Sequence, residues 1–426
     1  MFKKYVQRKL EHLVRVYFAK HQDVKLVVVV GAAGKTTTKI SIATVLNEKF
    51  RVRMEDTNHN TQLSVPPALL GVEYPEGKVH SPLAWHKVFK AMRSRIAAPT
   101  DVDVIIQELG TDHPGEIPHF GHYLKPDIAV VTSVVPEHME FFGTVENVAR
   151  EELSVTAYAA MTFINRDDID AKFADFIKSE RIFTYGVHPP AEYHFLFDEG
   201  QDILTAFAGD FISPELGNVP AEINLVGEHN LKAGIAAGAI GAKLGMMAAE
   251  INQGLGKIRP VPGRMNILQG QRDTTLIDDT YNSSPAAAIA ALKTLYNIKA
   301  VQRIAILGSM NELGDTSPEA HKQVGQFCDP TKLEMVVTIG RDARQYLVPA
   351  AQEKGNRVKS FLNPIEAGAF VSQHMQPGAV ILAKGSQNGV FAEEALKILL
   401  RTTEDDAKLV RQSLHWLDLK RDLFTK

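Results

Sequence analysis

The chain of 426 residues has a single cysteine, Cys328, so no disulfide can form within it, which fits a reducing compartment. It has no apolar run near the ~18–20 residues that a membrane-spanning helix requires. Its start, MFKKYVQRKL, lacks the apolar stretch and small-residue cleavage site of a secretory signal. Neither charge sign is in clear excess, because 47 Lys and Arg stand against 50 Asp and Glu, so general binding to nucleic acid is not indicated. We expect a soluble, cytoplasmic, globular protein with no nucleic-acid partner.

The first segment, residues 1–23, has the pattern of an amphipathic helix. Apolar residues from Phe2 to Phe18 recur at spacings of three and four, and Lys and Arg residues stand between them. A basic helix of this kind can lie on an anionic membrane surface, or it can pack on its own domain or on a partner. The sequence leaves both possibilities open.

The next segment, residues 24–260, alternates buried strands with helices. The expected strands are 26–30, 102–109, 126–134 and 161–168, and the clearest helices are 147–160 and 228–245. This alternation predicts a mostly parallel sheet covered on both faces. Shorter apolar pieces between 183 and 225 predict an antiparallel appendage.

KIRPVPGRM (257–265) has two prolines and a glycine, so we expect a linker there and a third segment over 261–426. In that segment, strands ending on Gly, Asp or Asn are expected at 275–282, 303–310, 335–340 and 379–386. The fold class is therefore α/β: a short N-terminal helix, a central P-loop ATPase-like domain and a C-terminal Rossmann-like domain. Ligands of such sheets bind at the carboxyl ends of the strands.

The most specific local signal is GAAGKTTT (31–38), placed between an expected strand and an expected helix. Small residues allow backbone N–H groups to surround a phosphate, a lysine reaches the outer phosphates, and a hydroxyl can bind Mg²⁺. The alternative is a glycine-rich turn with an exposed lysine. We favour a nucleotide site formed by Gly31, Ala32, Ala33, Gly34, Lys35, Thr36 and Thr37.

Seven further motifs follow in order: NHNTQLSVP (58–66), ELGTDHPGE (108–116), EHMEFFGT (137–144), GEHN (227–230), DDTYNSSP (278–285), LGSMNELG (307–314) and KGS (384–386). With the short phosphate loop and Arg264 in the linker, this series resembles the Mur ligases, the ATP-dependent amide-bond ligases of peptidoglycan synthesis. The forms of the ELG, DTYN and LGSM motifs are most similar to those of the D-alanyl-D-alanine-adding members. The resemblance covers about residues 26 to 395.

The resemblance implies a reaction and a set of residues. ATP phosphorylates a carboxylate, an amine attacks the acyl phosphate, and ADP and phosphate leave; the substrates would be a UDP-sugar peptide acceptor and a dipeptide. Lys35, Glu108, His138 and Arg264 would be catalytic, and Asn58, Asn60, Lys384 and Ser386 would bind substrates. Asn230, Asp279, Tyr281 and Asn282 would contact ATP with Arg264, although each has a structural alternative as a helix-start residue, a turn acid or a core aromatic.

Two Mg²⁺ ions are also implied, with Thr36 and Glu108 on one and His138 near the other. The family usually has a carbamylated lysine after the histidine motif, but Glu152 stands at that place here. Our hypothesis is that Glu152, or Glu151 beside it, supplies a permanent carboxylate to the second ion. The alternative is that both acids face solvent near a helix N-terminus, where acidic residues are favoured.

The sequence differs from the family at its start, because only thirty residues precede Gly31, where the family usually has an N-terminal UDP-binding domain. The UDP group would then be held by other surfaces or by a partner, or the acceptor is not a UDP-sugar. The basic stretch 81–99 is either a helical insertion that contributes to acceptor or lipid-side binding or a solvated surface helix.

We expect a monomeric enzyme that adds D-Ala-D-Ala to UDP-MurNAc-tripeptide, with ATP and Mg²⁺ as cofactors. One alternative is a ligase for another carboxylate, such as a poly-glutamate or cofactor precursor, and another is a non-catalytic ATP-binding homologue. Membrane contact through the first helix stays open.

Overall fold

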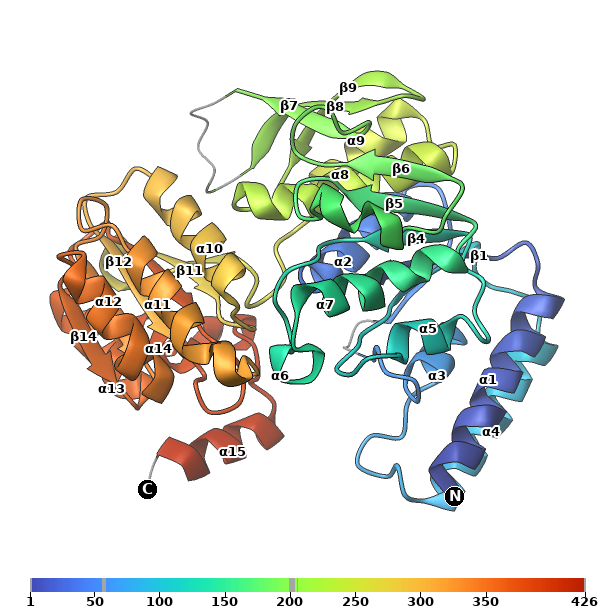
Figure 1. Ribbon diagram of the computed structural model, residues 1–426, viewed down its shortest axis with the longest axis horizontal. Coiled ribbons are helices and arrows are strands. Elements are labelled where there is room, and N and C mark those ends of the chain that lie inside the picture. The colour runs from blue at the N-terminus through green and yellow to red at the C-terminus, as the bar shows by residue number, and fades with distance from the viewer. Residues whose placement is uncertain (1, 56–58, 199–203, 205, 425–426) are drawn as a thin grey trace.

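The computed structural model describes residues 2–55, 59–198, 204 and 206–424. Two sheet-based halves lie side by side, and the chain passes from the first to the second between Lys257 and Asn266 (Figure 1). This passage lies within the expected linker. No helix in the described ranges is long and apolar enough to cross a membrane.

The first half is built on six parallel strands. Their spatial order is β2 (Val52–Met54), β3 (Val104–Glu108), β1 (Lys25–Val30), β4 (Ile128–Val131), β5 (Met161–Asn165) and β6 (Ile182–Tyr185). A parallel sheet covered on both faces needs apolar side chains on both, and LVVVV supplies them.

Alternate residues of β1 point to the two layers that cover the sheet. Leu26, Val28 and Val30 join one core, with α1 (Phe2–Lys20), α3 (Val65–Leu69), α4 (Pro82–Ala97), α5 (Glu116–Phe120) and α7 (Val145–Glu152). Val27 and Val29 join the other, with α2 (Lys35–Leu46), α8 (Glu228–Lys243) and α9 (Ala248–Lys257). This two-sided burial fixes the carboxyl ends of the strands, where the phosphate loop begins.

The N-terminal helix α1 packs against α3 and α4 of the first half. It buries Val6, Leu10, Leu13, Val14 and Tyr17. At about 1.5–3 kcal/mol per large apolar side chain removed from water, this contact holds α1 firmly in place. Of the two possibilities left open by the sequence, the structure shows packing on the chain's own domain.

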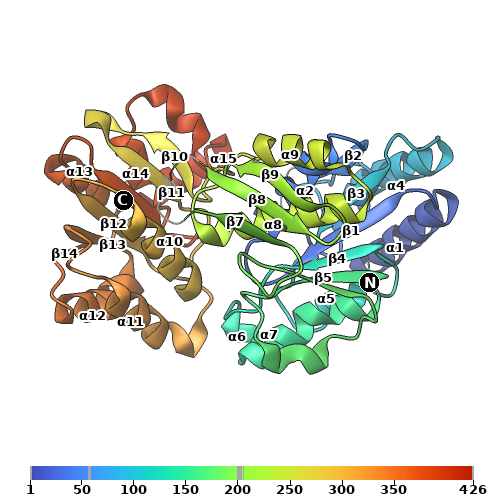
Figure 2. The ribbon, with the colours of Figure 1, turned by 90° about the horizontal axis from the view of Figure 1, so that it is seen from above.

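A three-stranded antiparallel sheet lies over α8 and α9, as Figure 2 shows from above. It contains β7 (His194–Phe197), β8 (Phe207–Ser213) and β9 (Gly217–Ile223). The antiparallel appendage expected between 183 and 225 is confirmed for these strands. The expected start of the appendage at residue 183 was wrong, because residues 183–185 belong to β6, which pairs in parallel with β5 in the main sheet.

The helix expected over 147–160 ends early. The α-helix α7 stops at Glu152, and a 3₁₀ turn covers Leu153–Ala157. The Ser154 hydroxyl donates to the Glu151 carbonyl, and the Thr156 hydroxyl donates to the Leu153 carbonyl at 2.7 Å. Hydroxyl groups that bond nearby backbone in this way compete with helical hydrogen bonding, which the apolar periodicity does not reveal.

The second half repeats the layered plan. Its strand order is β10 (Asn266–Gln269), β11 (Thr275–Asp279), β15 (Val380–Lys384), β12 (Arg303–Gly308), β13 (Met335–Ile339) and β14 (Val358–Phe361), and β10 alone is antiparallel among these strands. One face carries α10 (Pro285–Asn297), α11 (Ser317–Phe327) and α12 (Val348–Glu353); the other carries α13 (Pro364–His374) and α14 (Glu393–Leu399). The last helix, α15, spans Leu414–Phe424.

Candidate active site

The phosphate loop occupies the bend between β1 and α2. Gly31 has φ of 125° and Gly34 has φ of 82°, a region that side chains other than glycine rarely adopt. A Cβ added at Gly31 would lie 2.2 Å from Oγ1 of Thr132, so the loop approaches β4 too closely for any larger residue. Backbone N–H groups of Ala32 and Ala33 donate to the carbonyl and hydroxyl of Ser133 at 3.0 and 2.8 Å. The segment that follows β4 therefore holds the phosphate loop in place.

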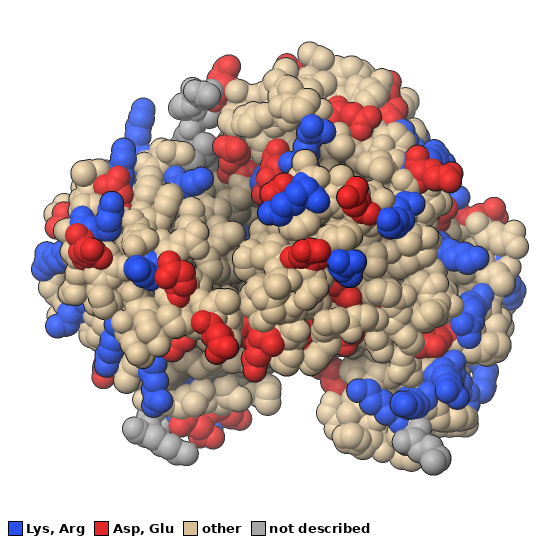
Figure 3. Space-filling model, in the orientation of Figure 1, with Lys and Arg blue, Asp and Glu red and all other residues tan. Residues whose placement is uncertain are grey.

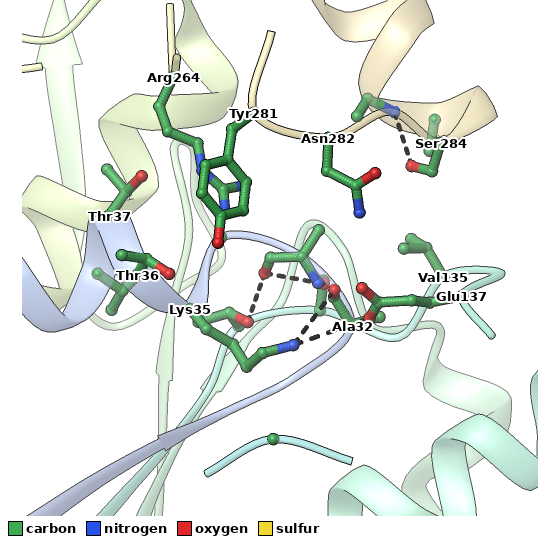
Figure 4. Close-up of a pocket in the computed structure, with 18 of the residues that line it drawn as sticks. Ala32, Lys35, Thr36, Thr37, Val135, Glu137, Arg264, Tyr281, Asn282 and Ser284 are labelled. Atoms are coloured by element: carbon green, nitrogen blue, oxygen red, sulfur yellow. Dashed lines mark hydrogen bonds and ion pairs between the residues drawn. The ribbon is translucent and has the colours of Figure 1, made fainter. Parts of the chain in front are cut away.

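Lys35 lies at the first turn of α2, with its ammonium folded back over the loop. Nζ donates to the Gly31 carbonyl at 2.6 Å and lies 3.8 Å from a carboxylate oxygen of Glu137 (Figure 4). Burial favours the neutral amine, but the charges of Glu137 and Glu152 outweigh it and raise the pKa of Lys35 above its ordinary value. The lysine therefore offers a permanent positive charge to an anion in the loop.

Beside Lys35, Thr36 and Glu108 meet as the resemblance implies. The Thr36 hydroxyl donates to Oε2 of Glu108 at 2.9 Å, and the Asn60 amide donates to the other carboxylate oxygen at 3.2 Å. Both Thr36 and Glu108 line the cavity described below. Hydroxyl and carboxylate oxygens are ligands that Mg²⁺ prefers, so this pair fits one such ion.

His138 joins the two halves of the molecule. Its Nδ1 lies 2.9 Å from Oε2 of Glu312 in the second half, and its Nε2 lies 3.6 Å from Asp112. Burial favours the neutral ring, yet the hydrogen bond to Glu312 and the charge of Glu137 raise the pKa of His138. In this arrangement both ring nitrogens face carboxylates, so His138 bridges the two halves, and its role as a metal ligand stays a prediction.

Glu152 faces the back of the phosphate loop. Its Oε2 accepts a hydrogen bond from the Gly31 N–H at 2.8 Å, and the side chain is buried. Burial raises the pKa of Glu152 to about 7. Glu152 is not among the residues that line the cavity, and the described residues contain no group of three or more His, Cys, Asp or Glu placed to hold a metal. The structure thus places Glu152 as a support of the loop.

The neighbouring acid, Glu151, has a structural task. Its two carboxylate oxygens accept from the backbone N–H groups of Gly115 and Ile117, each at 2.7 Å, at the start of α5. The alternative in which these acids face solvent is wrong, since both are buried. Glu151 is thus committed to the ELGTDHPGE loop and the start of α5.

The second half contributes the opposite wall of the cavity. The Arg264 guanidinium lies 4.2 Å from the ring centre of Tyr281, and both side chains extend toward the phosphate loop in Figure 4. Lys384 donates to Asp279 at 2.6 Å and to the Asn282 carbonyl at 3.0 Å. The charge of Lys384 is therefore matched by Asp279 before any substrate arrives.

Between the halves lies a cavity of about 570 Å³, and Figure 3 shows the hollow between them from outside. Among the predicted site residues, those that line the cavity are Ala32, Ala33, Gly34, Lys35, Thr36, Thr37, Asn60, Glu108, His138, Asn230, Arg264, Asp279, Tyr281, Asn282 and Lys384. Gly31, the first residue of the loop, is not among them. Ser386 is fully buried, and its hydroxyl donates to the Ser283 carbonyl at 3.2 Å, so it holds the wall and does not face the cavity. Asn58 lies outside the described residues.

The sequence reasoning missed some residues of this wall. Lys232 and Asp168 line the cavity as an ion pair at 2.7 Å, and Lys232 follows the GEHN motif by two positions, which was an available signal. Arg411 is different, because it lies outside every motif. It pairs with Glu393 at 2.7 Å and donates to the carbonyl of Tyr281 at 2.9 Å.

The loop, the following helix and the shared cleft define a two-domain nucleotide-binding protein of the P-loop type. The model of the Mur ligase middle domain matches residues 29–241, and that of the Mur ligase glutamate ligase domain matches residues 263–387. The chain belongs to the Mur ligase family.

Individual relatives agree with this assignment. The chain is 24% identical over 400 residues to the UDP-N-acetylmuramoyl-tripeptide–D-alanyl-D-alanine ligase of Bacillus subtilis, covering 92% of this chain and 79% of the relative. A crystal structure of MurF from Acinetobacter baumannii superposes with a TM-score of 0.76 at 22% identity, covering 92% of this chain and 80% of that one. MurF of Thermotoga maritima in complex with ADP gives a TM-score of 0.72 at 20% identity, with coverages of 92% and 83%. These structures share the fold described above.

Proposed function

We propose that this chain is an ATP-dependent ligase that joins D-Ala-D-Ala to a UDP-MurNAc-tripeptide, releasing ADP and phosphate. The main observation in support of this proposal is that the phosphate loop, Glu108 and Arg264 line one cavity between the two halves. The names of the curated relatives support the choice of acceptor and amine.

The proposed reaction has two steps. An oxygen of the acceptor carboxylate attacks the γ-phosphorus of ATP, the bond to the β–γ bridging oxygen breaks, and ADP leaves with that electron pair. The amine of D-Ala-D-Ala then attacks the acyl carbon of the acyl phosphate and gives a tetrahedral intermediate. Loss of a proton from nitrogen and of phosphate from carbon completes the amide. Such a reaction depends on positioning and on charge neutralisation.

The chain's own residues supply both. Lys35, with its raised pKa, places a fixed positive charge at the loop, and Arg264 places a second one opposite it. Tyr281 stacks on Arg264 and limits its orientations. Because the two cations come from different halves, the approach of the halves brings both charges to the transferring group.

Thr36 and Glu108 would hold Mg²⁺, which neutralises charge on phosphate oxygens when bound. For the second ion, we retain His138 as a hypothesis, and we propose that Glu152 supports the phosphate loop through its bond to the Gly31 N–H. Asn60 orients the Glu108 carboxylate through its amide.

The test is a product-mass assay with UDP-MurNAc-tripeptide, D-Ala-D-Ala and ATP. We expect an amide product together with ADP, and a fall of about 10²–10³ in rate for Lys35→Met, as for the loss of one group that stabilises transition-state charge. Lys25→Met is a matched control, since Lys25 is an exposed residue at the start of β1 and pairs with Asp127. Product formation unchanged in Lys35→Met would contradict the proposal.

The same assay separates the alternatives. A ligase for another carboxylate would release ADP only with a different acceptor, such as a poly-glutamate precursor. A non-catalytic homologue would bind ATP and release no phosphate with any acceptor and amine.

A further inference from the structure

A second cavity, of about 550 Å³, lies where the first turns of α1 and α4 meet the loop between α3 and α4. Its walls are mainly apolar and aromatic, with Phe2, Tyr74 and Trp85 among them. Tyr74 and Trp85 pack edge to face, with ring centres 5.8 Å apart. The site is therefore suited to a flat or ring-shaped group.

This second cavity adjoins the ATP cavity. Thr61, Gln62 and Glu116 line both. A molecule whose reacting end lies beside Glu108 can therefore pass along these three residues and place its remote end against α1 and α4. Neither ATP nor a dipeptide needs such a path, whereas a long acceptor does.

Polar groups at the second cavity favour an anionic ligand with polar ring edges. Oε1 of Gln62 accepts from the Gln7 amide at 3.0 Å, and in the described part of the chain no acceptor is bonded to the Gln62 amide nitrogen. This nitrogen can donate to a ring carbonyl. Lys3 lines the cavity with an exposed ammonium, and Lys and Arg side chains gather over the same ends of α1 and α4 in Figure 3.

We propose that this second cavity binds the nucleotide-diphosphate end of the sugar-nucleotide acceptor. The base lies among Phe2, Tyr74 and Gln62, the diphosphate lies by Lys3, and the peptide carboxylate reaches the ATP cavity along Thr61 and Glu116. This proposal rests on the proposed function, since it assigns a place to the acceptor named there.

The test compares two double variants of full-length protein. Phe2→Ala/Lys3→Glu alters the second cavity, and Lys4→Glu/Tyr5→Ala makes the same kinds of change beside it, on residues that do not line the cavity. Phe2 and Tyr5 are 39% and 57% exposed, so neither pair removes a core residue.

We expect the first variant to raise KM for UDP-MurNAc-tripeptide about tenfold, a loss within the range of one aromatic–base stacking contact. The second variant should change KM for UDP-MurNAc-tripeptide by less than about twofold. In both variants, KM for ATP and KM for D-Ala-D-Ala should stay unchanged. UDP alone should inhibit wild type competitively against the acceptor and not against ATP, and its inhibition constant should rise in the first variant only.

Equal KM values for the acceptor in both variants, in an active wild type, would overturn the proposal and leave the proposed function standing. No turnover of the acceptor by wild type would overturn both. Sedimentation with phosphatidylglycerol vesicles covers the membrane alternative. If both variants lose vesicle binding equally and neither changes KM, these helix ends serve a lipid surface and the proposal is wrong.

Discussion

Replacing Arg411 should weaken both the fold and nucleotide binding, although Arg411 belongs to no motif. Its side chain is 5% exposed, and its guanidinium pairs with the fully buried Glu393 through Nε at 2.8 Å and Nη2 at 2.7 Å. It also donates to the carbonyls of Thr280 and Tyr281 at 2.6 and 2.9 Å. Arg411 thus ties the C-terminal segment to the loop that carries Tyr281.

The cost of Arg411→Met can be worked from these contacts. Removing one partner of a buried ion pair costs about 3–5 kcal/mol. Lys420 also pairs with Glu393, at 2.9 Å, and would still neutralise it. We therefore expect Arg411→Met to lower the free energy of unfolding, measured with urea, by about 3 kcal/mol, the lower end of that range. We also expect KM for ATP to rise several-fold.

A matched control and a double-mutant cycle make this prediction refutable. Arg401 is 61% exposed and lies 3.7 Å from the exposed Asp273, so Arg401→Met should cost less than about 1 kcal/mol. Arg411→Met and Glu393→Leu should be non-additive by about 1 kcal/mol or more, because they share one interaction. An additive cycle, or a cost for Arg411→Met no larger than that for Arg401→Met, would refute the reasoning.

Three further outcomes are expected. Gly31→Ala should abolish ATP binding by calorimetry, because its Cβ would meet Thr132. Gly245→Ala is the control: Gly245 has φ of 79° in open space at the end of α8, so the change should cost only about 1 kcal/mol and leave binding intact. Burial raises the pKa of Asp278 to about 6. The folded state then holds more protons than the unfolded state between about pH 4 and 6, so unfolding free energy should fall by about 3 kcal/mol as pH rises through that window, and Asp278→Asn should flatten the slope in urea titrations at several pH values. Glu152→Gln should keep the Mg²⁺ concentration for half-maximal activity within about twofold, because the residue supports the loop; a tenfold rise would restore it as a ligand.

Much of the architecture could be predicted because it depends on local patterns. The run LVVVV followed by GAAGKTTT specifies a buried strand, a bend and a helix, and the structure has them at β1 and α2. The meeting of Thr36 with Glu108 was also predicted, through the resemblance.

The parts that could not be predicted depend on contacts between distant residues. The pattern could not show that Glu152 bonds Gly31 or that Glu151 serves α5, because acids near the end of a helix are compatible with solvent, metal or backbone partners. Ser386 and Lys384 are two residues apart, yet one is sealed in the wall and the other lines the cavity. The role of Arg411 depends on tertiary contacts with Glu393 and with the backbone of Thr280 and Tyr281, and it has no sequence signal.

Each half of the molecule has apolar cores of its own, joined by Val226 of the first half to one core of the second, while the cations at the transferring group are divided between the halves. A polypeptide cleaved within residues 258–265 should thus give two fragments that can each collapse around a core of their own. When the cut lies before Arg264, neither fragment holds both Lys35 and Arg264. Turnover should return only when the fragments are recombined, and its dependence on fragment concentration would measure how strongly ATP draws the halves together.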